Sequence, residues 1–175
     1  MLWPMRPVLL LCVLFAACAA PAAPIAAAAP ERAAARVLDD LHRLASTADG
    51  EAYFELFAPG AVYIGTDAGE RWSVGEFRAY AEPYFAQGRG WTYAVRERHL
   101  AVSADGRTVW FDERLDNASY GECRGSGVLV LGPDGWRIAQ YVLSLPVPNA
   151  LARDLVERIR ALESGEGPVE GGGGL

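Results

Sequence analysis

Apolar residues recur at helical spacing where the folded part of the chain begins. Val37, Leu41, Leu44 and Ala48 are three or four positions apart, so they lie on one side of a helix. A second, shorter helix is predicted to follow at Asp49, whose side chain can cap it, and a proline–glycine pair ends it. The start of the domain is therefore predicted to be helical.

A short strand and a third helix are predicted next. Residues 61–65 (AVYIG) have the composition of a strand. Ser73 and Glu76 have the spacing of a capping box, in which the serine accepts from the backbone and the glutamate reaches back. The helix that they begin presents aromatic residues, among them Tyr80 and Tyr84, along one face.

After Gly90 the pattern becomes that of strands. Asp-Gly, Asn-Ala-Ser-Tyr and Pro-Asp-Gly turns separate segments rich in Val, Trp, Tyr and Leu, which is typical of consecutive hairpins. These segments are residues 91–103, 107–116, 121–131 and 136–145. Asn149 is predicted to cap a last helix, with Leu151, Leu155, Ile159 and Leu162 on its buried side. Helices followed by a meander predict an α+β domain whose helices lie on one sheet face.

Pairing the predicted strands brings several charged residues together. If the Asp-Gly turn between the first two strands has two residues, Arg98 lies opposite Glu113. A four-residue turn after the second strand then places Arg124 beside Glu113, and Tyr141 falls on the same face. Because a buried charge is costly unless it is paired, this cluster at the mouth of an apolar cup is either a structural ion network or a site that recognises a ligand.

The same pairing sets His99 opposite Asp112 on the other sheet face. A carboxylate that orients an imidazole could make His99 a general base. On an outer face the two residues would form only a cross-strand charge pair. That face also carries Trp110 and Trp136, which favours a subunit interface there.

The chain begins like an exported protein. Residues 1–18 combine a positively charged start with a short apolar run (PVLLLCVLFAA) that is too short to cross a bilayer as a helix. Cys18 stands where a bacterial lipobox places the lipidated cysteine, and ordinary cleavage after Ala19 or Ala20 is the alternative. Residues 19–30 are an Ala/Pro tether. A short buried helix is the other interpretation of the apolar run.

These boundaries leave a folded domain at residues 31–163 and a Gly-rich tail at residues 164–175 that is predicted to be disordered. The expected location is outside the cytoplasm of a bacterium, either periplasmic or as a membrane-anchored lipoprotein. Contact with a membrane is expected only through the lipid anchor.

Composition narrows the chemistry. The 175 residues carry a formal net charge of −6 and no basic stripe, which argues against nucleic acid as a partner. Cys123 is the only cysteine in the predicted domain, so no internal disulfide framework is expected. His42 and His99 are the only histidines and have no ligand-spaced carboxylates beside them, so no metal site and no cofactor are expected.

Several blocks of the sequence resemble a known family. They are TVWFDERLDNASYGECRGSGVLV (108–130) and GWRIAQYVLSLPVPN (135–149), with YIGTD (63–67) and Trp72 upstream. Over residues 31–160 the chain is similar to the SnoaL-like branch of the nuclear transport factor 2 and ketosteroid isomerase-like superfamily. The resemblance implies a cone-shaped, curved antiparallel sheet with helices over its concave face, a pocket between them and a homodimer through the outer sheet face. It also implies that enzymes of this kind transfer protons without a metal.

The function expected first is an exported domain that binds a small molecule. Its predicted ligand-binding residues are Arg98, Glu113, Arg124 and Tyr141, with Tyr63, Asp67 and Trp72 closing the cup. The alternative is a cofactor-free acid–base enzyme, an isomerase, cyclase or hydrolase, with Glu113, Asp112 or His99 as candidate catalytic residues. A structural dimerisation domain is a third possibility.

Overall fold

The computed structural model of the chain describes residues 25–165. This part of the chain contains the helices α1 (Ile25–Ser46), α2 (Gly50–Glu55), α3 (Val74–Phe85) and α4 (Ala152–Glu163). Its strands are β1 (Phe57–Ile64), β2 (Arg71–Ser73), β3 (Ala94–Val102), β4 (Thr108–Asn117), β5 (Gly121–Gly132) and β6 (Gly135–Ser144). The predicted α+β class is confirmed.

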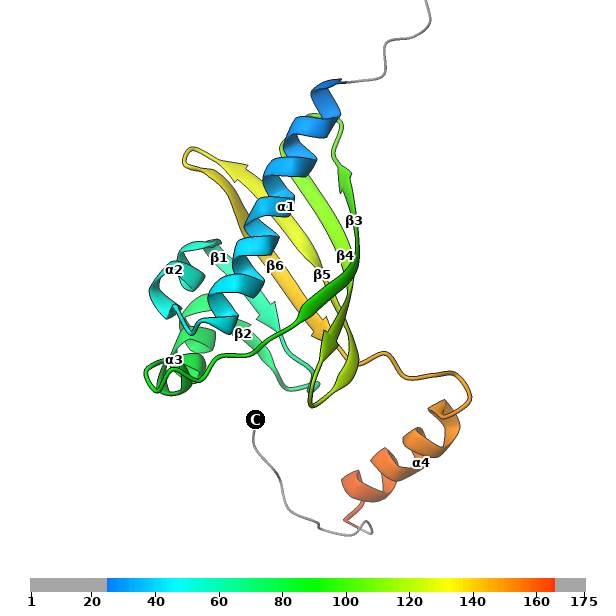
Figure 1. Ribbon diagram of the computed structural model, residues 1–175. Coiled ribbons are helices and arrows are strands. Elements are labelled where there is room, and N and C mark those ends of the chain that lie inside the picture. The colour runs from blue at the N-terminus through cyan, green and yellow to red at the C-terminus, as the bar shows by residue number, and fades with distance from the viewer. Residues whose placement is uncertain (1–24, 166–175) are drawn as a thin grey trace, which may run out of the picture.

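The six strands form one curved sheet in the order β2-β1-β6-β5-β4-β3. Strands β3 to β6 are antiparallel neighbours in chain order, as predicted, and β1 joins β6 in parallel. In Figure 1, α1 crosses one face of the sheet, and α2 and α3 lie beside the end that β1 and β2 form. The first three helices therefore lie on a single face of the sheet.

Helix α1 packs on the sheet because one side of it is apolar. Ala34, Leu38, Leu41 and Ala45 are all buried at helical spacing. Of the predicted stripe, Leu41 and Leu44 are in the core, whereas Val37 and Ala48 are only partly buried. The helix also includes the last residues of the predicted tether, since alanine has the highest helix propensity.

The capping box at the start of α3 is confirmed. The backbone N–H of Glu76 donates to the Ser73 hydroxyl at 3.3 Å, and the backbone N–H of Ser73 donates to Glu76 Oε2 at 2.8 Å. This cap fixes the direction in which α3 leaves β2. The helix then buries Phe77 against the aromatic ring of Tyr53, which is itself fully buried.

The predicted register is confirmed for the first hairpin and wrong for the second. Arg98 pairs with Glu113 and His99 with Asp112, as expected. The next loop has three residues instead of four, because Gly121 adopts a left-handed conformation (φ 71°) that closes a shorter turn. Every β5 residue therefore moves by one position.

This shift exchanges the two faces of β5, because successive side chains of a strand point to opposite sides. Glu113 faces Gly125, and Arg124 faces Arg114 on the outer side of the sheet. Leu129 is therefore fully buried, whereas Val130 is not.

The register of the third hairpin is correct only near its turn. Ile138 of β6 pairs with Leu129 and is buried with it, because the shorter loop has exchanged the faces of β5. A bulge between Val128 and Leu129 then shifts the pairing of the following β6 residues by one position. Because of this bulge Tyr141 lies on its predicted face, where it is buried, as is Leu143.

Helix α4 forms as predicted, but its apolar side is not buried. No residue of α4 is buried, and its N-cap is Leu151 instead of Asn149. The residues predicted to face the core are exposed: Leu151, Leu155, Ile159 and Leu162. Prolines at 146 and 148 keep the segment after β6 extended, and α4 lies beyond the end of the sheet in Figure 1.

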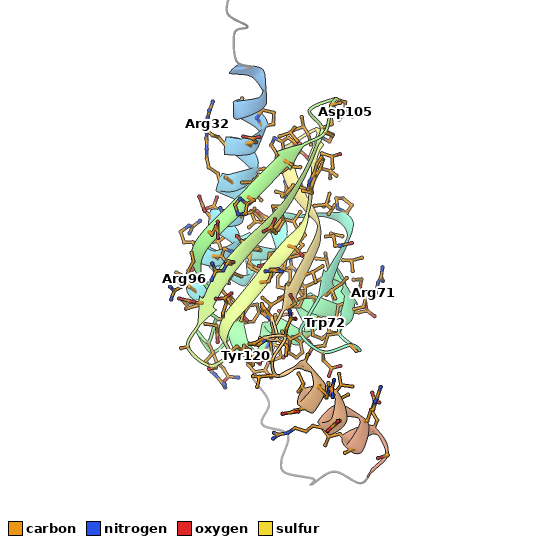
Figure 2. The ribbon with its side chains drawn as sticks, turned by 90° about the vertical axis from the view of Figure 1, so that its right-hand side faces the viewer. Arg32, Arg71, Trp72, Arg96, Asp105 and Tyr120 are labelled. Carbon is orange, nitrogen blue, oxygen red and sulfur yellow. The ribbon has the colours of Figure 1, made fainter. Side chains whose placement is uncertain are left out.

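The outer sheet face has a charged end and a more apolar end. Figure 2 views the sheet with α1 behind it and shows Arg96 on the strand at its edge. Arg96 pairs with Asp116, and Arg114 donates to Glu122 at 2.8 Å. Trp110 lies on the same face and is 50% exposed. The homodimer through this face stays a prediction.

The predicted signal segment, including Cys18, lies outside the described residues, as does the tail after Gly165. Within residues 25–165, no helix is both long enough and apolar enough to cross a membrane.

The corrected register can be tested with two neighbouring residues of β5. We expect Leu129→Ala to lower the free energy of unfolding by about 2–5 kcal/mol, because it opens a cavity in the core. Val130→Ala, the matched control, should cost about 1 kcal/mol or less, since Val130 points to the outer face. Urea denaturation measures both, and the reverse order of effects would show that the register is wrong.

Candidate functional site

A buried carboxylate lies at the centre of a polar cluster between α1 and the sheet. Glu113 on β4 is completely buried. Its Oε1 is 2.7 Å from Nε2 of His42 and accepts from the hydroxyl of Tyr141 at 3.2 Å. Its Oε2 accepts from Nε of Arg98 at 2.8 Å. Since an ionised carboxylate can only accept, His42 is the donor in this contact.

Arg98 ties the cluster to α1. Its Nη1 donates to Oδ1 of Asp39 at 2.7 Å and to the backbone carbonyl of Ala35 at 3.2 Å. Its Nη2 is buried and has no hydrogen-bond partner among residues 25–165. Arg98 therefore joins β3, β4 and one face of α1 through a single guanidinium group.

The charges around Glu113 keep it ionised. Burial is the largest influence on its pKa and would raise it, but the hydrogen bond and charge of His42, together with those of Arg98, outweigh burial and hold the pKa below the ordinary value of 4.5. Burial raises the pKa of Tyr141 well above its usual range, and the neighbouring Glu113 raises it further. This is the electrostatics of a stable ion network.

The cluster has room for its side chains because the residue of β5 opposite Glu113 is a glycine, Gly125. A Cβ atom on Gly125 would lie only 2.8 Å from Oε1 of Glu113, and it would also collide with the hydroxyl of Tyr141. Gly125 therefore serves close packing, as strand glycines often do.

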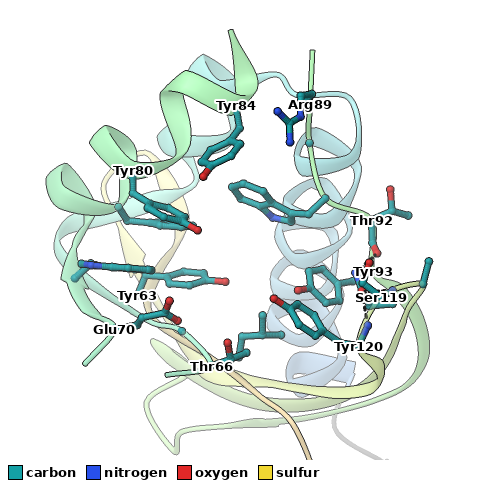
Figure 3. Close-up of a pocket in the computed structure, with 18 residues that line it drawn as sticks. Tyr63, Thr66, Glu70, Tyr80, Tyr84, Arg89, Thr92, Tyr93, Ser119 and Tyr120 are labelled. Carbon is teal, nitrogen blue, oxygen red and sulfur yellow. Dashed lines mark hydrogen bonds between the residues drawn. The ribbon is translucent and has the colours of Figure 1, made fainter. Parts of the chain in front are cut away.

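A separate open cavity of about 560 Å³ lies beside the cluster. It is bounded by α3, the turn between β1 and β2, the segment before β3 and the loop between β4 and β5 (Figure 3). We call its aromatic lining the aromatic cup. The cup consists of Tyr63, Trp72, Phe77, Tyr80, Tyr84, Trp91, Tyr93 and Tyr120.

One wall of the cup is a stack of nearly parallel rings. The ring centroids of Tyr63 and Phe77 are 3.8 Å apart, those of Phe77 and Trp72 are 5.7 Å apart, and those of Trp72 and Tyr80 are 5.0 Å apart. Tyr63 also stacks on Tyr141, with centroids 5.6 Å apart. The buried cluster thus touches the back of this wall through Tyr141.

A small void of about 10 Å³ lies between the two regions. It is lined by His42 and Tyr141 from the cluster and by Tyr63 and Tyr93 from the cup. His42 therefore lies one layer behind the wall of the cavity.

The structure places the predicted ligand residues in four different settings. Tyr63 and Trp72 line the cavity. Arg98, Glu113 and Tyr141 lie together in the buried cluster, not in the lining of the cavity. Arg124 is exposed on the outer face, and Asp67 does not line the cavity: Oδ1 of Asp67 accepts from the backbone of Gly69 at 2.8 Å within the β1–β2 turn. These last two placements differ from the prediction.

The predicted His99–Asp112 pair lies on the outer face, away from the cavity. Both side chains are exposed, and Nε2 of His99 is 3.1 Å from Oε1 of Glu97. Cys123 is buried, and burial raises the pKa of its thiol, which disfavours the nucleophilic thiolate.

Sequence reasoning missed His42 and most of the cup. His42 follows Leu38 by one helical turn, so its position beside the buried stripe could have been read from the periodicity of α1. Trp91, Tyr93 and Tyr120 lie in irregular segments, for which periodicity carries no signal.

The charge network predicts a specific dependence on pH. Because the pKa of Glu113 is lower in the fold than its ordinary 4.5, its stabilising contribution is present above that value and is lost as the pH falls through the folded pKa. At neutral pH, Glu113→Gln should lower the free energy of unfolding by about 3–5 kcal/mol, since it leaves Arg98 buried beside a neutral amide. The difference from wild type should shrink in denaturant titrations on acidification below about pH 4.5.

The control for this test is Glu122→Gln on the outer face. Glu122 pairs with Arg114 in the open, so its substitution should change stability little at any pH. Equal losses in the two variants would contradict a special role for the buried carboxylate.

Comparisons with known proteins agree with this architecture. A family model described as a SnoaL-like domain matches residues 35–148. No curated protein matches the chain. A putative dehydratase of the nuclear transport factor 2-like family from Streptomyces avermitilis is 13% identical, with a TM-score of 0.59 over 69% of this chain and 99% of that one.

Two further structures are similar at the level of the fold. A protein of unknown function from Pectobacterium atrosepticum is 19% identical, with a TM-score of 0.58 over 69% of this chain and 93% of that one. A putative aromatic ring hydroxylase from Novosphingobium aromaticivorans is 14% identical, with a TM-score of 0.58 over 69% of this chain and 92% of that one. Since the family model spans most of the domain and the folds agree, this chain belongs to the SnoaL-like domain family.

Proposed function

We propose that this domain binds a small organic molecule in the aromatic cup. The observation that carries the proposal is an open cavity of about 560 Å³ whose lining includes eight aromatic side chains. Ligand pockets have volumes of about 300–1,000 Å³ and are lined mainly by apolar and aromatic groups with a few polar ones. The cup has both properties.

The polar groups of the cavity are placed to orient a ligand. Figure 3 shows the hydroxyls of Tyr63 and Tyr80 and the carboxylate of Glu70 directed into the space, with Thr66 and Ser119 at its edge. The stacked rings beside them form an apolar wall. A planar body with few polar atoms would fit this combination.

The buried cluster has a supporting role in this proposal. Tyr141 is held by Glu113 on one side and stacks on Tyr63 on the other. Arg98, Glu113 and Tyr141, which we expected to contact a ligand, would instead keep the wall of the cup in place from behind.

Acid–base catalysis is the second candidate function, and one contact favours it. Glu113 accepts from Nε2 of His42 at 2.7 Å, so Nδ1 can accept a proton whenever the imidazole is neutral, and His42 borders the void behind the cup. Glu113 itself is a poor base because its pKa is lowered. A reaction would therefore use His42, not Asp112 or His99 on the outer face.

Export is a separate part of the proposal that rests on the sequence of residues 1–18. If Cys18 is lipidated, the full chain expressed in a bacterium should partition with membranes, and Cys18→Ser should release it to the soluble fraction. Fractionation and immunoblotting measure this. A soluble wild-type protein would instead support ordinary signal cleavage.

Ligand binding can be tested with N-phenyl-1-naphthylamine, a neutral and flat molecule whose fluorescence rises in apolar sites. We expect saturable binding to the wild type and a loss of about fivefold or more in affinity for Tyr80→Ala, since one aromatic contact is worth about 1 kcal/mol. Trp110→Ala is the matched control, because it removes an exposed ring from the outer face. Equal affinity of wild type and Tyr80→Ala would exclude the cup as the binding site.

A further inference from the structure

Only two charged side chains, Glu70 and Arg89, line the cavity within the described part of the chain. The carboxylate of Glu70 is held at the wall by a hydrogen bond, since its Oε2 accepts from the backbone N–H of Asp67 at 3.1 Å. The turn is closed by a second bond, from the backbone N–H of Gly65 to the carbonyl of Glu70 at 2.8 Å. Glu70 is thus a positioned group on the cavity wall and not a freely moving surface residue.

The negative charge of Glu70 is not neutralised by a neighbouring side chain. Across residues 25–165, Glu70 takes part in no salt bridge. Arg89 lies elsewhere on the rim in Figure 3, is exposed, and places its guanidinium 5.5 Å from the ring centroid of Tyr84. Arg89, the one cationic side chain of the lining, therefore interacts with an aromatic ring and does not neutralise the charge of Glu70.

Two tyrosines of the cup, Tyr63 and Tyr80, lie within range of the charge of Glu70. The face of an aromatic ring carries the negative part of its quadrupole and attracts cations, above all quaternary ammonium groups. Burial is the main cause that raises the pKa of Tyr80, and the neighbouring Tyr84 and the charge of Glu70 raise it further. Glu70 also contributes, after burial, to raising the pKa of Tyr63. The carboxylate thus acts on the same space that these rings enclose.

We propose that the ligand of the cup is an organic cation, a quaternary or tertiary ammonium group on a flat apolar body, with Glu70 as its counter-charge. This inference rests on the proposed function, because it assigns a chemical class to the ligand of the same cavity. A neutral ligand would remove water from Glu70 without pairing its charge, which is costly. An anion would be repelled by the carboxylate. A bare metal ion would lack donors, since residues 25–165 contain no group of three His, Cys, Asp or Glu side chains that could hold one.

The test compares two molecules of the same shape that differ in charge. Phenyltrimethylammonium is the cation, and tert-butylbenzene is its neutral isostere. Protein-detected NMR titrations of the full chain should give at least tenfold tighter binding for the cation. Glu70→Gln should remove most of that preference, because it lowers the affinity for the cation and not for the isostere. The unchanged affinity of the isostere then shows that the variant is folded.

Two controls make the result specific to Glu70. Asp112→Asn removes a carboxylate from the outer face and should leave both affinities unchanged. For the wild type, raising the salt concentration from about 0.05 to about 0.5 M shortens the screening length roughly threefold, which should lower the affinity for the cation and not for the isostere. This second measurement needs no variant.

The outcomes separate the two proposals. If the isostere binds as tightly as the cation and Glu70→Gln changes neither, the assignment of a cation is wrong, while the cup remains a binding site. If neither molecule binds at millimolar concentration and N-phenyl-1-naphthylamine also fails to bind, the cup is not a ligand site and both proposals fall.

Discussion

The fold depends on keeping one negative charge inside it. Glu113 is completely buried, and an unpaired carboxylate at such a place would be very costly. Its two oxygens are satisfied from different elements, by His42 of α1, Arg98 of β3 and Tyr141 of β6. Apolar contacts alone would hold α1 on the sheet without fixing its position along the helix axis. The directional bonds to Glu113 select one position, because the carboxylate is satisfied only there.

That constraint extends from the cluster to the cavity. Tyr141 bonds to Glu113 and stacks on Tyr63, and Tyr63 stacks on Phe77, which continues to Trp72 and Tyr80. A rigid stack of this kind cannot collapse inward to fill the empty space, since each ring is supported from behind. The open cavity is therefore compatible with a well-packed core. The same chain of contacts explains why charged residues predicted to touch a ligand lie behind the wall and not on it.

The parts of the structure that follow local rules could be predicted from the sequence. The capping box at Ser73, the Asp-Gly hairpin and the pairing of Arg98 with Glu113 depend only on neighbouring residues or on one short turn. The error in β5 came from a loop whose length was one residue shorter than assumed, because Gly121 permits a left-handed turn. A strand has a period of two, so that single residue moved Arg124 from the expected cluster to the surface.

Contacts between elements that are distant in the sequence could not be predicted from such local rules. Helix α4 has a regular apolar stripe, yet the stripe is exposed, because periodicity tells which side of a helix is apolar and not whether another element covers it. Similarly, the rings of the cup come from α3, β1, β2 and two irregular segments that meet only in the folded chain. Structures with 13–19% identity share this fold. Since a shared fold does not transfer function, the specificity of this domain has to be sought in the lining residues themselves, where one carboxylate, Glu70, shares the cavity with eight aromatic side chains.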